Sequence, residues 1–110
     1  MNTLRITLRV VFYRQVERWV AHCLEFDLCG DGPTREAALT GLTDAIRIQE
    51  EDSLAHGNRA NLFSPADGKL FQMFAAGKDV GIGQMHLKWD SIEVESAEAR
   101  EYSDGDLVCA

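Results

Sequence analysis

Residues 19–39 read WVAHCLEFDLCGDGPTREAAL, and this stretch joins extended chain to the beginning of a helix. Residues 19–26 are rich in aromatic and β-branched side chains, which is typical of a strand. Residues 27–30 can turn the chain into a short third strand, and the run Gly30-Asp31-Gly32-Pro33-Thr34 then ends the extended structure. Thr34 is the expected N-cap, because its hydroxyl can accept a hydrogen bond from the first turn of a helix.

The pattern within residues 19–26 also predicts which side chains share a face. Successive residues of a strand point to opposite faces. One face should therefore carry Val20, His22, Leu24 and Phe26, and the other Trp19, Ala21, Cys23 and Glu25.

The segment after Thr34 predicts one amphipathic helix of about five turns that ends near His56 and Gly57. The residues expected on its packed side follow i, i+3, i+4 spacing, namely Ala38, Leu39, Leu42, Ala45, Ile46 and Gln49. The residues expected on the solvent side are Thr40, Thr43, Asp44, Arg47, Glu50 and Glu51.

The flanking segments add further elements on either side. Residues 4–13 alternate apolar and polar side chains and predict a first strand, with 14–18 as a hairpin loop. Residues 64–76 predict a short helix with an apolar stripe, and 77–83 a glycine-rich mobile turn. Alternation resumes over 85–89 and 92–94, with a phase slip at residues 90–91 that indicates a bulge or tight turn.

Together these elements predict an α+β fold in which one long helix covers an antiparallel sheet of three to four strands. A short second helix and a C-terminal strand follow the β-β-β-α core. The length of 110 residues fits a single domain over 1–110. We expect a core over about 4–57, an extension over about 58–96 and a frayed acidic tail over about 97–110.

Composition and charge exclude several classes of protein. The formal charge of −7 disfavours a general DNA or RNA binder, because such proteins rely on a basic surface. No apolar run reaches the length of a membrane helix, and the first residues do not resemble a signal peptide. Three cysteines fit no disulfide framework. We therefore expect a cytoplasmic protein with free thiols and no contact with a membrane.

A set of residues within this stretch resembles the HicB-type antitoxins and their stand-alone relatives. The family pattern is a strand reading roughly W-V-A-x-C-L-E, then G-D-T-x-E-E-A-L at the beginning of a helix. The matching residues are Trp19, Ala21, Cys23, Glu25, Gly32, Thr34, Glu36, Ala38 and Leu39. Pro33 and Ala37 depart from the pattern, and both residues suit the beginning of a helix.

The resemblance implies a partial ribonuclease H-like fold and a non-catalytic role. HicB-type antitoxins bind and mask HicA-type toxins, which are small basic proteins that cleave messenger RNA. Full-length antitoxins usually add a C-terminal DNA-binding domain. Residues 58–110 lack its tandem helices and basic charge, so we expect no specific DNA binding.

The charges are unevenly distributed along the chain. Arg5, Arg9, Arg14 and Arg18, together with Glu17, give the first eighteen residues a charge of +3, whereas residues 90–110 carry −6. The basic residues are interpreted as a solvated or edge-strand face, with weak RNA contact as the minority alternative. The acidic residues could attract a basic toxin. Candidate partner-binding residues are Asp44, Glu50, Glu51, Glu93 and Glu95.

Catalytic and metal sites have little support in the sequence. A ribonuclease H-like nuclease needs several carboxylates around two metal ions, and residues 4–13 contain no acid. His22 and Cys23 are adjacent on a strand and should point to opposite faces, which disfavours zinc binding. We therefore expect no enzyme activity, metal or cofactor, and a homo-oligomer, with a dimer favoured. A small regulatory or ligand-binding module without a toxin is the main alternative.

Overall fold

The computed structural model describes residues 4–57, 64–81, 88–89 and 92–103, which form two helices and six strands. In chain order these are β1 (Leu4–Gln15), β2 (Arg18–Cys23), β3 (Leu28–Gly32), α1 (Arg35–Ala55), α2 (Gly68–Ala76), β4 (Lys78–Val80), β5 (Lys88–Trp89) and β6 (Ile92–Glu101). The α+β class and the β-β-β-α order at the beginning of the chain are as predicted. Neither described helix combines the length and apolar character needed to cross a bilayer.

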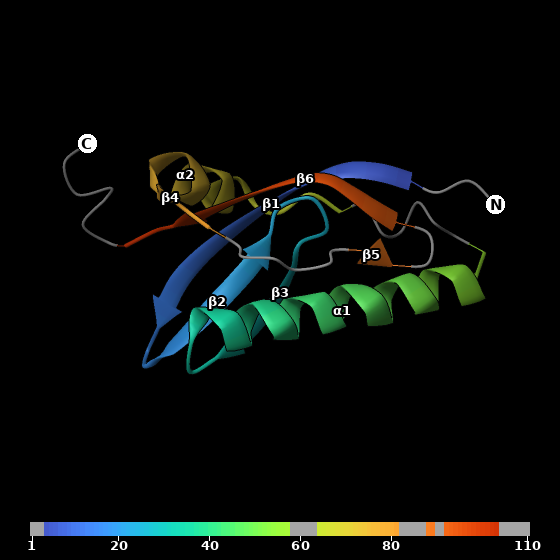
Figure 1. Cartoon of the computed structure of the whole chain (residues 1–110), viewed down its shortest axis with the longest axis horizontal. Helices are drawn as coiled ribbons and strands as arrows, with labels where there is room; N and C mark the ends of the chain where they lie inside the picture. The colour runs from blue at the N-terminus through green and yellow to red at the C-terminus, as the bar shows by residue number, and fades with distance from the viewer. Residues whose placement is uncertain (1–3, 58–63, 82–87, 90–91, 104–110) are drawn as a thin grey trace.

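The strands form one mixed sheet in the order β3-β2-β1-β6-β4, with β5 also paired to β6 (Figure 1). The first three strands are antiparallel, as predicted. The expectation of a wholly antiparallel sheet is wrong, because β6 pairs with β1 in parallel. A parallel pair needs a long connection between its strands, and here that connection includes both helices.

The long helix α1 covers part of one face of the sheet, mainly over β3 and β2. The alternating residues Leu8, Val10 and Phe12 of β1 lie in this core together with Leu42 and Ile46 of α1. The N-cap at Thr34 accepts a hydrogen bond from the Ala37 amide, as predicted. The C-terminal end is also as predicted, with Gly57 at a positive φ of 63°.

A glycine at the contact between β3 and α1 allows the helix to approach closely. A Cβ atom at Gly30 would lie 2.1 Å from the Leu42 nitrogen and 2.5 Å from the Ala38 carbonyl oxygen. No side chain fits in that space, because the neighbouring atoms belong to the backbone of α1. Gly30 to Gly32 therefore belong to a strand against the helix, whereas the sequence suggested a turn there.

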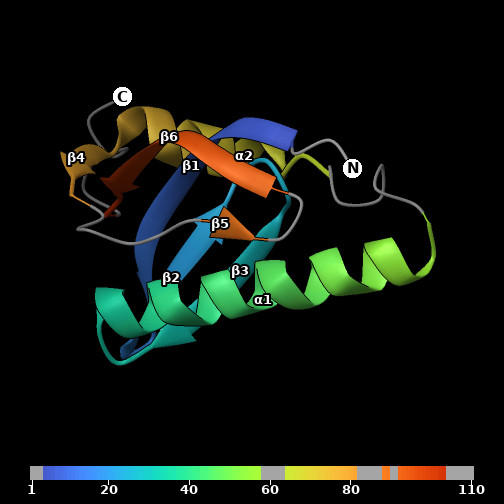
Figure 2. The same ribbon diagram turned by 45° about the vertical axis from the view of Figure 1, so that its right-hand side comes forward.

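The short helix α2 packs on the opposite face of the sheet (Figures 1 and 2). Met73 and Phe74 of α2 share a buried cluster with Val11 of β1 and Leu24, and the partly buried Leu70 and Phe71 pack against this cluster. The predicted apolar stripe is thus covered within the chain. This removes one reason for expecting a homo-oligomer, which remains a prediction.

Several predicted boundaries shift by a few residues. Strand β2 ends at Cys23, and a turn with Asp27 at a φ of 53° follows. Glu25 was predicted to share a face with Cys23. The alternation of the strand stops before Glu25, however, and Glu25 pairs with Arg9 on the opposite face. Helix α2 begins at Gly68 instead of residue 64, because the Ala66 amide donates a hydrogen bond to the Leu24 carbonyl.

The C-terminal region is more ordered than the sequence suggested. Residues 97–101 were expected in a frayed tail, but they belong to β6 and pair with β1 and β4. The segment 78–80, expected within a mobile turn, forms β4. The expected bulge at residues 90–91 and the tail residues 104–110 lie outside the described residues. A register shift does occur in the β1–β6 pair, between Ile6 and Thr7 opposite Glu95.

Candidate functional site

The basic residues of the first strand and hairpin are largely paired with carboxylates. Arg9 donates from its Nε to Glu25 Oε2 over 2.7 Å, and the Arg9 amide donates to Glu25 Oε1 over 2.8 Å. Arg18 Nε donates to Asp31 Oδ2 over 2.8 Å. These pairings leave no continuous basic stripe on the described part of β1 and its hairpin, which disfavours the alternative of RNA contact.

The acidic end of the chain contributes to the same pairing. Glu93 of β6 lies beside Arg5 of β1 in the parallel register, and their charged atoms are 3.9 Å apart. Glu101 accepts a hydrogen bond from Arg35 at the beginning of α1 over 3.0 Å. Part of the negative charge near the C-terminus is therefore paired within the fold. Glu93 neutralises a basic residue of the first strand, and Glu101 neutralises one at the beginning of α1.

The acidic residues predicted on α1 have different environments. Asp44 and Glu51 are exposed, and Arg47 lies between them at 4.0 Å and 3.3 Å respectively. Glu50 was predicted on the solvent side, but it is buried, with 2% of its surface exposed. At about 100° per residue, Glu50 lies only about 40° around the helix from the core residue Ile46. Glu50 is therefore unavailable to a partner.

One apolar side chain stands out on the solvent side of α1. Ile48 is 59% exposed, and among the described residues only Val16 in the hairpin turn is another large hydrophobic side chain left this open. Asp44 and Asp52 lie four residues to either side of Ile48, and Glu51 lies three residues beyond it. Residues at these spacings are neighbours on a helix surface. We call Asp44, Ile48, Glu51 and Asp52 the acidic face of α1.

Ile48 was not predicted as a site residue, because the charged residues around it dominate this side of the helix. The available signal was an isoleucine out of phase with the apolar positions, about 180° around the helix from Leu39. The two acidic residues predicted on β6 do not join this face. Glu93 pairs with Arg5 of β1, and Glu95 is exposed at the register shift. The five predicted partner-binding residues therefore do not form a single surface.

The residues that resemble the antitoxin pattern are mostly structural. Ala21, Cys23, Ala38 and Leu39 are buried in the core beneath α1. Trp19 packs against that core, and Glu25 pairs with Arg9. Gly32 is buried, Thr34 is the N-cap of α1, and Glu36 is exposed. These positions determine the packing of strand and helix, and they do not gather around a reactive centre.

The cysteine and histidine side chains do not form a catalytic or metal cluster in the described part of the chain. Cys23 points into the core and His22 to the opposite face, as predicted. Asp27 Oδ1 lies 2.8 Å from His22 Nε2, and His22 Nδ1 has no described hydrogen-bond partner. The thiol of Cys29, directly across the strands from His22, is therefore not bonded to the ring. Burial raises the pKa of Cys29, and that of Cys23 to about 12.

No three histidine, cysteine, aspartate or glutamate side chains of the described residues are placed to hold one ion. Structural zinc normally takes four such ligands. The arrangement of His22, Cys23 and Cys29 thus offers no described metal centre.

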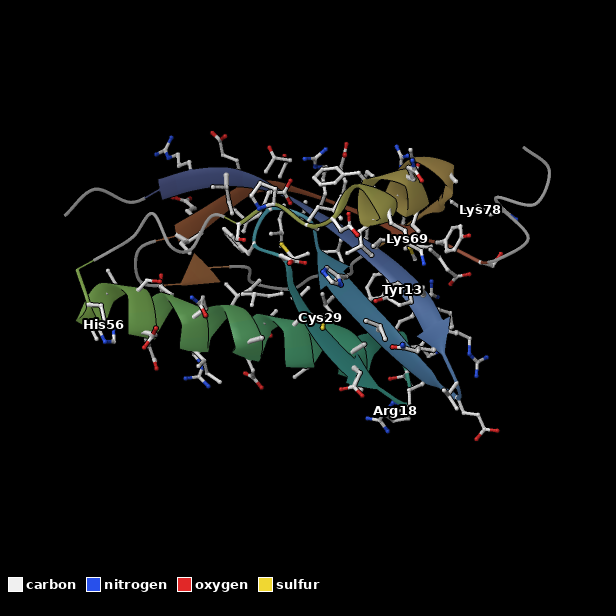
Figure 3. The ribbon with its side chains drawn as sticks, turned by 180° about the vertical axis from the view of Figure 1, so that it is seen from behind. Tyr13, Arg18, Cys29, His56, Lys69 and Lys78 are labelled. Carbon is white, nitrogen blue, oxygen red and sulfur yellow. The ribbon has the colours of Figure 1, made fainter. Side chains whose placement is uncertain are left out.

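A groove of about 800 Å³ lies where β1 and β6 end beside the beginning of α2. We call it the aromatic groove, because its lining includes the rings of Tyr13, Trp19 and Tyr102. The charged residues that line it are Arg14, Asp67, Lys69 and Glu101. Figure 3 shows Tyr13 and Lys69 at this end of the molecule, far from His56 at the end of α1. The groove gathers residues from three segments that are distant in sequence, namely 13–19, 67–73 and 101–103.

Comparison of the chain with protein-family models, with curated proteins and with solved structures found no match.

Proposed function

We propose that this chain is a non-catalytic interaction module that binds a small basic protein through the acidic face of α1. The observation that carries the proposal is the exposed Ile48 among the side chains of Asp44, Glu51 and Asp52, which are 61%, 62% and 64% exposed. An apolar anchor surrounded by charge is a common arrangement in protein interfaces.

The charge of this face indicates the chemistry of the partner. Arg47 lies between two of its three carboxylates, Asp44 and Glu51. The third, Asp52, lies 3.5 Å from His56 Nδ1. Opposite charge on a partner accelerates association and helps to orient the complex. The partner would therefore present a basic surface with an apolar depression for Ile48.

The resemblance of the motif residues to HicB-type antitoxins suggests which basic protein this is. A HicA-type toxin is small, basic and cleaves messenger RNA, and an antitoxin acts by masking it. We propose steric masking of such a toxin, with no chemistry performed by this chain. The absence of an acid from residues 4–15 supports a binding role over a ribonuclease H-like one.

The test is to add the purified chain to a HicA-type toxin encoded beside its gene and measure RNA cleavage. The proposal expects cleavage to stop near equimolar chain. Ile48→Asp should relieve the inhibition, whereas Val16→Asp should not, because it makes the same change at an exposed site in the hairpin turn. Undiminished cleavage with excess wild-type chain would remove the proposal.

A further inference from the structure

The aromatic groove has the location and size of a small-molecule site. β1 and β6 are parallel neighbours, and both strands end at the groove. Its volume of about 800 Å³ lies within the usual range for ligand pockets. The acidic face of α1 contributes no residue to its lining. The proposed protein interaction therefore does not account for the groove.

Three aromatic rings provide surfaces on which a flat molecule can stack. Tyr13 comes from β1, Trp19 from β2, and Tyr102 follows β6. Offset or edge-to-face contacts between rings favour aromatic ligands over aliphatic ones of the same area. The Tyr13 hydroxyl can donate a hydrogen bond, and burial raises its pKa above the ordinary value of 10.0.

The charges around the groove favour an anion. Glu101 is already paired with Arg35, whose guanidinium also lies 5.7 Å from the centre of the Trp19 ring. The Arg14 guanidinium lies 5.5 Å from the same ring. Neither Arg14 nor Lys69 has a carboxylate partner among the described residues. A cationic ligand would therefore be repelled near Trp19 by the guanidinium groups of Arg14 and Arg35.

Asp67 is the one opposing charge in the lining without a described partner. Its side chain makes no capping hydrogen bond to α2, so it acts on the groove mainly through its charge. The lining holds two cations, Arg14 and Lys69, and two carboxylates, Asp67 and Glu101, so it is neutral in a chain whose overall charge is −7. The groove is thus locally more positive than the rest of the protein.

We infer that the aromatic groove binds a small planar anion, in which an aromatic ring carries a carboxylate or phosphate group. The ring lies against Tyr13, Trp19 or Tyr102, and the anionic group lies at Lys69 and Arg14. This site is independent of the proposed interaction with a basic protein.

The test uses four naphthalene probes that share one ring system: naphthoate, naphthyl phosphate, naphthamide and naphthylmethylamine. Binding to the full chain is followed by amide NMR, with the indole N–H of Trp19 as the groove reporter. We expect naphthoate or naphthyl phosphate to give saturable shifts in the groove, and the amide and amine to bind at least about tenfold more weakly. The tighter of the two acids identifies the anionic group.

Variants locate the anion within the groove. Lys69→Ala should weaken binding of the tighter acid about tenfold, since it removes a charged contact. Lys78→Ala is the matched control, because Lys78 is exposed on β4 and does not line the groove (Figure 3). Asp67→Asn should strengthen binding by removing an opposing charge. Folding of each variant is checked by its unperturbed amide spectrum.

Three results would overturn the inference. These are the absence of saturable shifts at millimolar acid, equal affinity for all four probes, or equal loss in the Lys69 and Lys78 variants. Each of them leaves the inhibition of RNA cleavage by wild-type chain unaffected. Conversely, failure of that inhibition leaves the groove measurement unchanged, so the two proposals fail separately.

Discussion

Gly30→Ala should destabilise the fold more than the same substitution at any other glycine that the structure describes. The new Cβ would lie 2.1 Å from the Leu42 nitrogen, 2.4 Å from the Gly41 carbonyl carbon and 2.5 Å from the Ala38 carbonyl oxygen. Ordinary contact begins near 3.4 Å. Since these are backbone atoms, rotation of a side chain cannot relieve the clash, and α1 must move away from β3 by about 1 Å.

The cost of this movement should be at the upper end for overpacked sites, about 3 kcal/mol. For a domain of this size that corresponds to a fall in Tm of at least about 10 °C. Urea unfolding followed by circular dichroism measures the free energy, and thermal unfolding measures Tm. Gly68→Ala is the control, because nothing lies within 4 Å of its added Cβ, and it should change stability by less than about 1 kcal/mol.

A second variant separates the clash from the general effect of alanine in this region. Gly41→Ala places its Cβ 3.3 Å from the Gly30 Cα, and the gain in helix propensity of about 1 kcal/mol opposes the tight contact. It should therefore be close to neutral. If Gly30→Ala unfolds at the same urea concentration as the wild type, the close packing of α1 on β3 is wrong.

Three smaller perturbations test other parts of the fold. Glu25→Gln should lower the unfolding free energy by about 1–2 kcal/mol, because the Glu25 carboxylate is largely buried against Arg9. The Glu93 side chain is 46% exposed, so Glu93→Gln should lower it by less than about 0.5 kcal/mol. Equal losses in urea unfolding would contradict this assignment. The pKa of Cys23 is raised to about 12, so the unfolded chain releases this proton first and stability falls as pH rises from about 9 to 12. Cys23→Ala should reduce that slope by up to about 1.4 kcal/mol per pH unit, and an unchanged slope would place the titration elsewhere. Thr34→Ala should lower the unfolding free energy by about 1 kcal/mol, because it removes the N-cap of α1. An unchanged free energy would contradict the hydrogen bond from the Ala37 amide to the Thr34 hydroxyl.

The local elements could be predicted from the sequence because each has a short-range signal. The alternation of Leu8, Val10 and Phe12 indicated a half-buried strand, and Thr34 and Gly57 marked the ends of α1. The pairing of the last strand could not be predicted in this way. Ile92 and Val94 alternate in a manner typical of a strand, but alternation does not specify which neighbour a strand pairs with or in which direction.

The candidate site was predicted less well than the fold, for two physical reasons. Glu50 was assigned to the solvent side from its charge, although its position around the helix places it with Ile46. The aromatic groove depends on tertiary proximity, since Tyr13 and Tyr102 come together only because β1 and β6 are parallel neighbours. No spacing in the sequence reports such a juxtaposition.

The most direct test of the proposed interaction is calorimetric titration of a small basic HicA-type toxin into this chain. We expect equimolar binding that weakens as the salt concentration rises, because the acidic face of α1 attracts the partner through its charge. We also expect at least about a hundredfold loss of affinity in Ile48→Asp, with Val16→Asp unchanged. Absence of binding to the wild-type chain, or equal affinity for both variants, would contradict it.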